Sequence, residues 1–160
     1  MEWQAYTNKK LYYARLQLDA WERSESFEQE AYREAFLVHA FQAYASMLAE
    51  VLLPYGVKLS KLVSLEEARR LIREREGIAE FEQLKQLQQS DSWLIRLQHA
   101  YGQLSYLEDD TPSTSGRINA VMIASSGEPT GRVKTPEGAR NILSSLKCLV
   151  KHFREFNQEL

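Results

Sequence analysis

Four polar side chains inside an apolar segment form the pattern in this chain that is best suited to chemistry. Between residues 35 and 53 nearly every residue is apolar, and the exceptions are three or four positions apart, so on a helix they share one stripe. Histidine and glutamate are common general acids, general bases and metal ligands, and amide or hydroxyl groups between them can orient a bound molecule. We call this set the polar stripe: His39, Gln42, Ser46 and Glu50.

The length of the polar stripe limits what it can do. His39 and Glu50 lie three helical turns apart, about 16 Å along the axis, which is too far for a shared hydrogen bond. This separation argues against a catalytic pair. The sequence favours a stripe that water or another segment covers, and it leaves open a groove beside the stripe that binds a small molecule.

Arg33 and His39 supply an enzymatic alternative. An arginine four to six residues before a histidine is the spacing of helical ribonucleases of the HEPN type, in which the pair polarises the scissile phosphate. Because the chain is rich in arginine, about one such match is expected by chance, and in that family the motif usually lies later in the bundle. We retain a HEPN-like ribonuclease or nucleotide-handling protein as the alternative hypothesis.

A cysteine and a histidine near the C-terminus have the spacing of two metal ligands. Cys148 and His152 are one helical turn apart. Zinc needs three or four ligands, and His39 or His99 would complete a site only if the fold brought them together. We therefore predict no metal site and no cofactor, and the single cysteine excludes an internal disulfide.

A polar, glycine-containing stretch before the last predicted helix offers a weak anion-binding site. Arg132 and Lys134 provide positive charge, and the helix N-terminus at Thr135 provides backbone amides. The stretch is not a phosphate-binding P-loop, because the lysine and hydroxyl that must follow the second glycine are missing and no strand precedes it. We list Arg132, Lys134 and Thr135 as candidate anion-binding residues.

Length and charge restrict the class of protein. At 160 residues the chain suits a single domain, residues 1–160, and its formal net charge of −2 provides no bulk attraction to nucleic acid or an anionic membrane. Trp and Tyr are dense near the N-terminus, but only Lys9, Lys10 and Arg15 interleave them, so we expect packing rather than base stacking. The first residues lack the pattern of a signal peptide, which predicts a cytoplasmic protein.

Hydrophobic periodicity predicts an all-α fold. We expect an irregular bundle of five to six helices around a central apolar helix at residues 26–53, with a long loop or extended segment at residues 108–135. The central run contains too many polar and small residues for a membrane span, and the mean hydropathy of the chain is −0.46. The other predicted helices cover residues 8–23, 64–77, 78–87, a segment that starts at Asp91 or Ser92, and a segment that starts at Thr135.

Three stretches of the chain resemble a family of small bacterial proteins that has no assigned function. They are residues 7–14, residues 91–94 with Leu97 and Tyr101, and residues 118–124. The resemblance implies a helical fold and supplies no activity, cofactor or site residues. The stretch from Ser125 to Lys134 has no counterpart in that family.

Our leading functional hypothesis is a non-enzymatic cytoplasmic protein that acts by interaction or regulation. It rests on the lack of a converging nucleophile, base and oxyanion donor in the sequence. A protein partner or self-association is favoured over nucleic acid, and no membrane association is expected. A small-molecule binder with its site beside the polar stripe is the second alternative to the ribonuclease.

Overall fold

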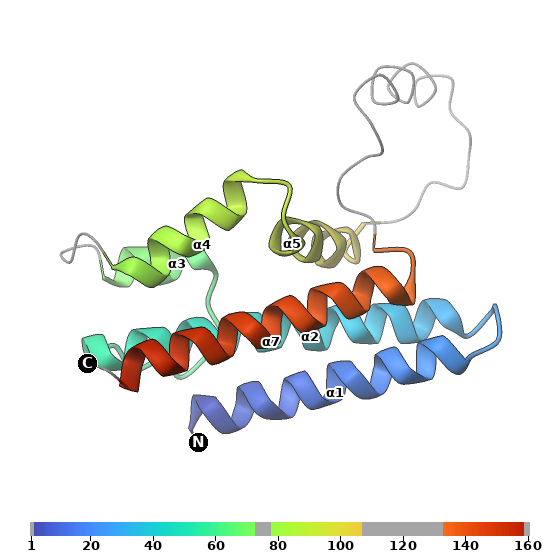
Figure 1. The fold of residues 1–160 in the computed structure, drawn as a ribbon, viewed down its shortest axis with the longest axis horizontal. Helices are drawn as coiled ribbons and strands as arrows, with labels where there is room; N and C mark the ends of the chain where they lie inside the picture. Colours follow the sequence, from blue (N-terminus) through green and yellow to red (C-terminus); the bar gives the residue numbers. More distant parts are fainter. Residues whose placement is uncertain (1, 73–77, 107–132, 159–160) are drawn as a thin grey trace, which may run out of the picture.

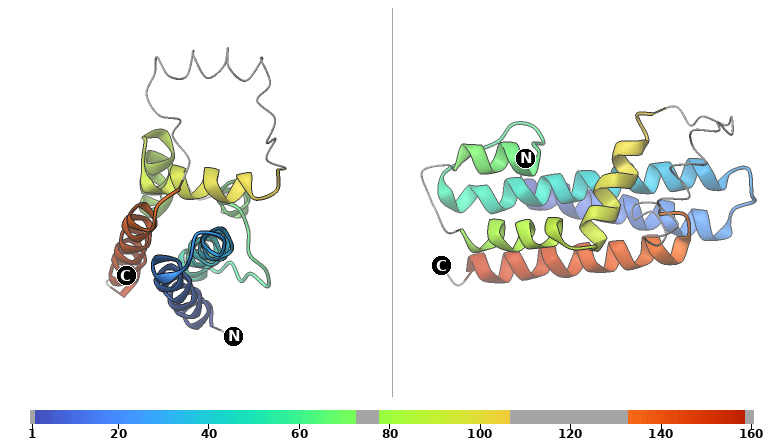
Figure 2. Two further views of the ribbon diagram at one scale, coloured as in Figure 1. Left: turned by 90° about the vertical axis from the view of Figure 1, so that its right-hand side faces the viewer. Right: turned by 90° about the horizontal axis from the view of Figure 1, so that it is seen from above.

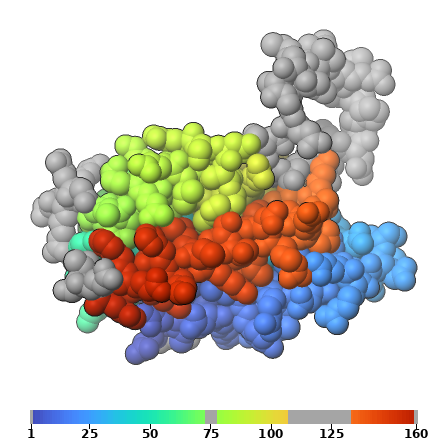
Figure 3. All heavy atoms as spheres, in the orientation of Figure 1, coloured from blue at the N-terminus to red at the C-terminus, as the bar shows by residue number. Residues whose placement is uncertain are grey.

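Three long helices run side by side and form the body of the protein (Figure 1). The computed structural model describes residues 2–72, 78–106 and 133–158. The long helices are α1 (Trp3–Arg23), α2 (Gln29–Leu52) and α7 (Pro136–Gln158). α1 and α2 form an antiparallel hairpin, and α7 lies beside both of them, as the spheres in Figure 3 show for α1.

The shorter helices cover the opposite side of α2. They are α3 (Leu65–Leu71), α4 (Ala79–Gln89) and α5 (Trp93–Gln103), with the 3-10 turn η1 (Leu53–Tyr55) after α2. Figure 2 shows α5 crossing the direction of α2, where Phe41 stacks on Tyr101 with ring centroids 4.0 Å apart. Because α2 contacts α1, α3, α5 and α7, it is the central helix, and the prediction of an all-helical bundle around it is confirmed.

The predicted bounds of the first two helices were wrong by a few residues. α1 begins at Trp3 rather than residue 8, because Glu2 takes the N-cap position and Thr7 lies buried inside the helix instead of capping it. α2 begins at Gln29 rather than residue 26, because Ser24 closes α1 and residues 25–28 connect the two helices. α2 ends at Leu52, and Gly56 with φ of +80° turns the chain after η1.

Predicted caps account for three of the later helix starts. The side chains of Ser64, Ser92 and Thr135 accept hydrogen bonds from backbone N–H groups of the first turns of α3, α5 and α7. α3 ends at Leu71 instead of reaching Gly77, and residues 73–77 lie outside the described part of the chain. The apolar segment predicted across the bundle, residues 118–124, also lies outside it.

The core fills the space between these helices. The predicted apolar face of α7 is confirmed: Ala139, Ile142, Leu143, Leu146, Leu149, Val150 and Phe153 are all buried. In the described part of the chain one stretch, Gln29–Tyr55, is long and apolar enough to cross a membrane by length and composition, but 72% of its apolar 18-residue window is buried inside the bundle. Core helices pass the same test, so this is weak evidence for a membrane span.

Candidate functional site

The polar stripe lies under α1 along most of its length. Ser46 is completely buried, and its hydroxyl oxygen is 2.8 Å from the hydroxyl oxygen of Thr7, which is also completely buried. The carbonyls of Trp3 and Ala43 accept further hydrogen bonds from this pair. Ser46 therefore joins two helices and has no room for a ligand.

His39 lies at the edge of the same helix contact. Its ring packs edge-on against Tyr13, with ring centroids 5.3 Å apart. Burial lowers the pKa of His39, the positive charge of Lys10 lowers it further, and the side chain of Gln42 partly opposes both effects. His39 and Gln42 are both half-buried, so this part of the stripe contacts α1 and only partly meets solvent.

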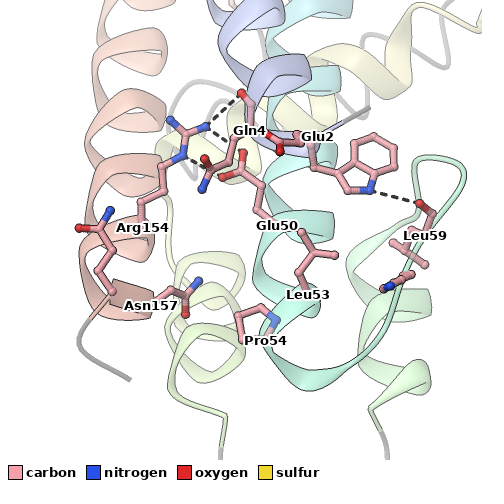
Figure 4. Close-up of a pocket in the computed structure, with 11 residues that line it drawn as sticks. Glu2, Gln4, Glu50, Leu53, Pro54, Leu59, Arg154 and Asn157 are labelled. Carbon is pink, nitrogen blue, oxygen red and sulfur yellow. Dashed lines mark hydrogen bonds and ion pairs between the residues drawn. The ribbon is translucent and has the colours of Figure 1, made fainter.

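Glu50, at the other end of the stripe, forms an ion pair with Arg154 of α7. Arg154 Nε and Nη2 donate to the two carboxylate oxygens of Glu50 at 2.8 and 2.9 Å, which is a bidentate pair. The same guanidinium donates to Asn8 Oδ1 at 2.9 Å and to the carbonyl of Gln4 at 3.4 Å. Figure 4 shows Arg154 reaching from α7 toward Glu50 and Gln4, so one side chain connects α7 with α1 and α2.

A pocket of about 730 Å³ opens beside this ion pair. Leu53, Pro54 and Leu59 contribute apolar surface to it (Figure 4). The indole N–H of Trp3 donates to the Leu59 carbonyl at 3.2 Å, which ties the loop after η1 to α1. We call this the Glu50–Arg154 pocket, and it is lined by Glu2, Trp3, Gln4, Glu50, Leu53, Pro54, Lys58, Leu59, Arg154, Asn157 and Gln158.

The polar groups of this pocket are mostly satisfied by one another. Both oxygens of Glu50 accept from Arg154, and the formal charges of Glu2 and Glu50 balance those of Lys58 and Arg154. One exception is Asn157, whose buried Oδ1 accepts no hydrogen bond from the described residues.

The structure does not bring Arg33 and His39 together. Arg33 Nε donates to the Val133 carbonyl at 2.7 Å, and its Nη1 pairs with Glu30 at 2.7 Å. His39 instead packs against Tyr13 on α1. Six residues along a helix also turn the two side chains about 120° apart, with a rise of about 9 Å, so the pair the ribonuclease hypothesis needs does not meet in one cleft.

Cys148 and His152 both line a second groove, of about 390 Å³, between α7 and the α4–α5 pair. Cys148 is exposed and Trp93 forms part of the same wall. Across residues 2–72, 78–106 and 133–158, no group of three His, Cys, Asp or Glu side chains is placed to hold a metal ion.

The candidate anion-binding residues are only partly described. Thr135 caps α7, where its Oγ1 accepts from the Gly138 N–H at 3.1 Å, and Lys134 is exposed beside it. Arg132 lies outside the described residues. The hydroxyl oxygen of Thr135 therefore caps the helix itself, and the anion-binding role of these residues stays a prediction.

Sequence reasoning found Glu50 but missed the residues that surround it. Arg154 and Asn157 are polar residues near the end of α7, with nothing in their local pattern that separates them from ordinary surface positions. The available signal was Glu50 itself, because a carboxylate on a buried helix needs a cation nearby.

The whole chain, residues 1–160, matches the model of a family of unknown function, DUF6586, and the protein belongs to that family. No curated protein and no solved structure matches the chain.

Proposed function

We propose that this protein is a non-enzymatic, cytoplasmic regulatory module that binds a small molecule in the Glu50–Arg154 pocket. One observation carries the proposal: a pocket of about 730 Å³ lies where α1, α2 and α7 meet, between apolar side chains and the fixed Glu50–Arg154 ion pair. The volume lies within the range of about 300–1,000 Å³ that is usual for small-molecule sites. Its lining, apolar surface with a few fixed polar groups, is also usual for such sites.

The lining indicates the kind of ligand. Because the four charged residues of the pocket balance, an uncharged or zwitterionic molecule suits it better than a strongly charged one. The ligand should place an apolar part against Leu53 and Leu59. Glu50 is suited to hold Arg154 in place rather than to accept a proton, since both of its oxygens already accept hydrogen bonds.

A ligand in this pocket would bridge three helices, which supports a regulatory role. The lining comes from the start of α1, the end of α2 and the end of α7. A molecule that contacts all three stabilises their packing, and at 100 times its dissociation constant it adds about 2.7 kcal/mol to the free energy of unfolding. For a chain of this size that corresponds to a rise in Tm of about 5–10 °C.

A thermal-shift screen tests the proposal with zwitterionic amino acids, nucleosides and small amides as probes. Leu53→Trp should fill the pocket and abolish any shift, whereas Leu71→Trp should leave it unchanged. Leu71 is the matched control, because Leu53 is 41% exposed and Leu71 is 47% exposed, but Leu71 lies on α3 outside the pocket. A shift that both variants keep, or none with any probe, would contradict the proposal. RNA cleavage abolished by Arg33→Ala would favour the ribonuclease instead.

A further inference from the structure

The solvent side of α1 carries a cluster of tyrosines and cations. Tyr12 is 49% exposed and Leu16 is 41% exposed, and the two side chains lie one helical turn apart. Figures 1 and 2 show α1 at the edge of the bundle, with α2 and α7 on its inner side. We call this cluster the basic–aromatic face; its residues are Lys9, Lys10, Tyr12, Tyr13, Arg15 and Leu16.

The basic–aromatic face is positively charged although the chain is not. Between Glu2 and Asp19 the chain contains three cations and no acidic residue, whereas its formal net charge is −2. The acids that follow are engaged by Arg140 of α7, which pairs with Asp19 at 3.4 Å and with Glu22 at 2.7 Å. Among the described residues no carboxylate forms an ion pair with Lys9, Lys10 or Arg15, so this part of α1 presents uncompensated positive charge.

The cations are held close to aromatic rings. Lys9 Nζ is 5.7 Å from the centroid of the Tyr13 ring, and the Arg15 guanidinium is 5.2 Å from that of Tyr12. Lys10 Nζ is 5.7 Å from the Tyr13 ring as well. Cation–π contacts of this kind restrict long side chains, so a partner that binds them loses less conformational entropy.

The spacing of the exposed residues suits a helical partner. Ala5, Lys9, Tyr12 and Leu16 are all exposed and are separated by four, three and four positions. This is the spacing of residues along one seam between two packed helices. Tyr12 and Leu16 supply the apolar contact of such a seam. Lys9 lies on the seam, and Lys10 and Arg15 lie on its two flanks, about 140° apart, where they suit carboxylates on the partner.

We propose that the basic–aromatic face binds an acidic amphipathic helix of a protein partner. Charge decides against a second copy of this chain, because the same face would then oppose its own three cations. Single-stranded nucleic acid is disfavoured because the chain's own cations already cover one face of the Tyr12 and Tyr13 rings. Two partly exposed apolar side chains offer too little area to insert into a membrane.

A labelled synthetic peptide of about three heptads tests this inference, with leucine at the seam positions and glutamate elsewhere. Binding to the full-length protein is measured by fluorescence anisotropy, and the same peptide with lysine in place of glutamate is the charge control. The glutamate peptide should bind at least about tenfold more tightly than the lysine peptide, and its binding should weaken as salt is raised.

Two sets of variants locate the binding surface. The triple variant Lys9→Glu, Lys10→Glu and Arg15→Glu should lose at least about tenfold in affinity for the glutamate peptide. The double variant Tyr12→Ala and Leu16→Ala should also weaken binding, by about fivefold, at unchanged charge. Circular dichroism checks that each variant is folded.

A control triple variant applies the same change of charge elsewhere. Lys61→Glu, Arg69→Glu and Lys147→Glu alter exposed cations outside α1 and should retain the affinity of the parent. Equal loss in both triple variants would overturn the inference. Failure of the parent to bind the glutamate peptide would also overturn it. Tighter binding of single-stranded RNA or of anionic vesicles through the same residues would do so too, as would dimerisation that the Tyr12 and Leu16 changes abolish. Because none of these assays uses the Glu50–Arg154 pocket, the outcome is independent of a ligand there.

Discussion

Replacing Arg154 with methionine tests whether the Glu50–Arg154 ion pair holds the three long helices together. The side chain of Glu50 is 7% exposed and that of Arg154 is 25% exposed. Without the guanidinium, the buried carboxylate loses two charge-assisted hydrogen bonds and water can replace them only poorly. Without the carboxylate, Arg154 keeps its contacts with Asn8 and Gln4 and remains partly hydrated. The two single substitutions should therefore have unequal effects.

The magnitudes follow from this asymmetry. Removing one partner of a buried ion pair costs about 3–5 kcal/mol, and partial access of water to Arg154 reduces our expectation to about 2–4 kcal/mol for Arg154→Met. Glu50→Gln keeps the shape of the side chain and should cost about 1–2 kcal/mol. The double variant Glu50→Leu and Arg154→Met leaves no unpaired charge, so it should be more stable than Arg154→Met alone.

Urea unfolding followed by tryptophan fluorescence and circular dichroism measures these differences. For a chain of this size, Arg154→Met should lower Tm by about 5–15 °C. Arg70→Met is the control, because Arg70 forms an exposed pair with Glu66 and its loss should change stability by less than about 0.5 kcal/mol. The reasoning fails if Arg154→Met costs no more than Glu50→Gln, or if the double variant is the least stable of the three.

Three other substitutions probe single contacts. Thr7→Val removes the hydroxyl that bonds Ser46 and should cost about 1–2 kcal/mol in urea unfolding; additive effects of Thr7→Val and Ser46→Ala would argue against a direct bond. Thr135→Val removes the cap of α7 and should cost about 1 kcal/mol, with faster amide exchange in the first turn; an unchanged exchange rate would contradict this. The pKa of His39 is lower in the folded state than in the unfolded chain, so the unfolded chain takes up a proton first as pH falls below about 6.5. The folded state therefore loses stability in that range. Above about pH 7 the imidazole is neutral in both states. His39→Gln should remove this part of the pH dependence, and free energies of unfolding measured between about pH 7.5 and pH 5 that fall equally in parent and variant would refute it.

Local chemistry explains why the later helices could be predicted well. The start of α7 is set by Thr135 and Pro136, which act within one turn, and its buried face repeats with the period of a helix. Ser64 and Ser92 act in the same way at α3 and α5. Such signals need no knowledge of the rest of the chain.

The start of α1 could not be predicted because tertiary contacts decide it. Thr7 looks like a capping residue in the sequence, since its hydroxyl can accept from exposed amides. In the fold the same hydroxyl is buried against Ser46, and the helix continues back to Trp3, whose indole is anchored on Leu59. A residue with two possible local roles takes the one that satisfies its polar group after packing.

The candidate site was predictable in kind but not in composition. A carboxylate on a buried helix must meet a cation, and Glu50 does. Its partner Arg154 lies 104 positions away, and the choice among the cations of the chain depends on how α7 is aligned beside α2. Periodicity shows which face of each helix is buried, but it does not show which residues of two buried faces meet.

The polar stripe contributes one hydrogen bond and one ion pair, and both fix how the helices align. In an interface between apolar helices many alignments bury similar areas, and a buried polar pair penalises every alignment that leaves one of its members without a partner. The Thr7–Ser46 hydrogen bond has this effect on α1 and α2, and the Glu50–Arg154 pair extends it to α7. Glu50 lies near the end of α2, just before η1, so the same pair that aligns the bundle also borders the Glu50–Arg154 pocket. A ligand in that pocket would therefore be coupled to the alignment of the three helices through one ion pair, which is the physical basis for proposing that binding regulates this protein.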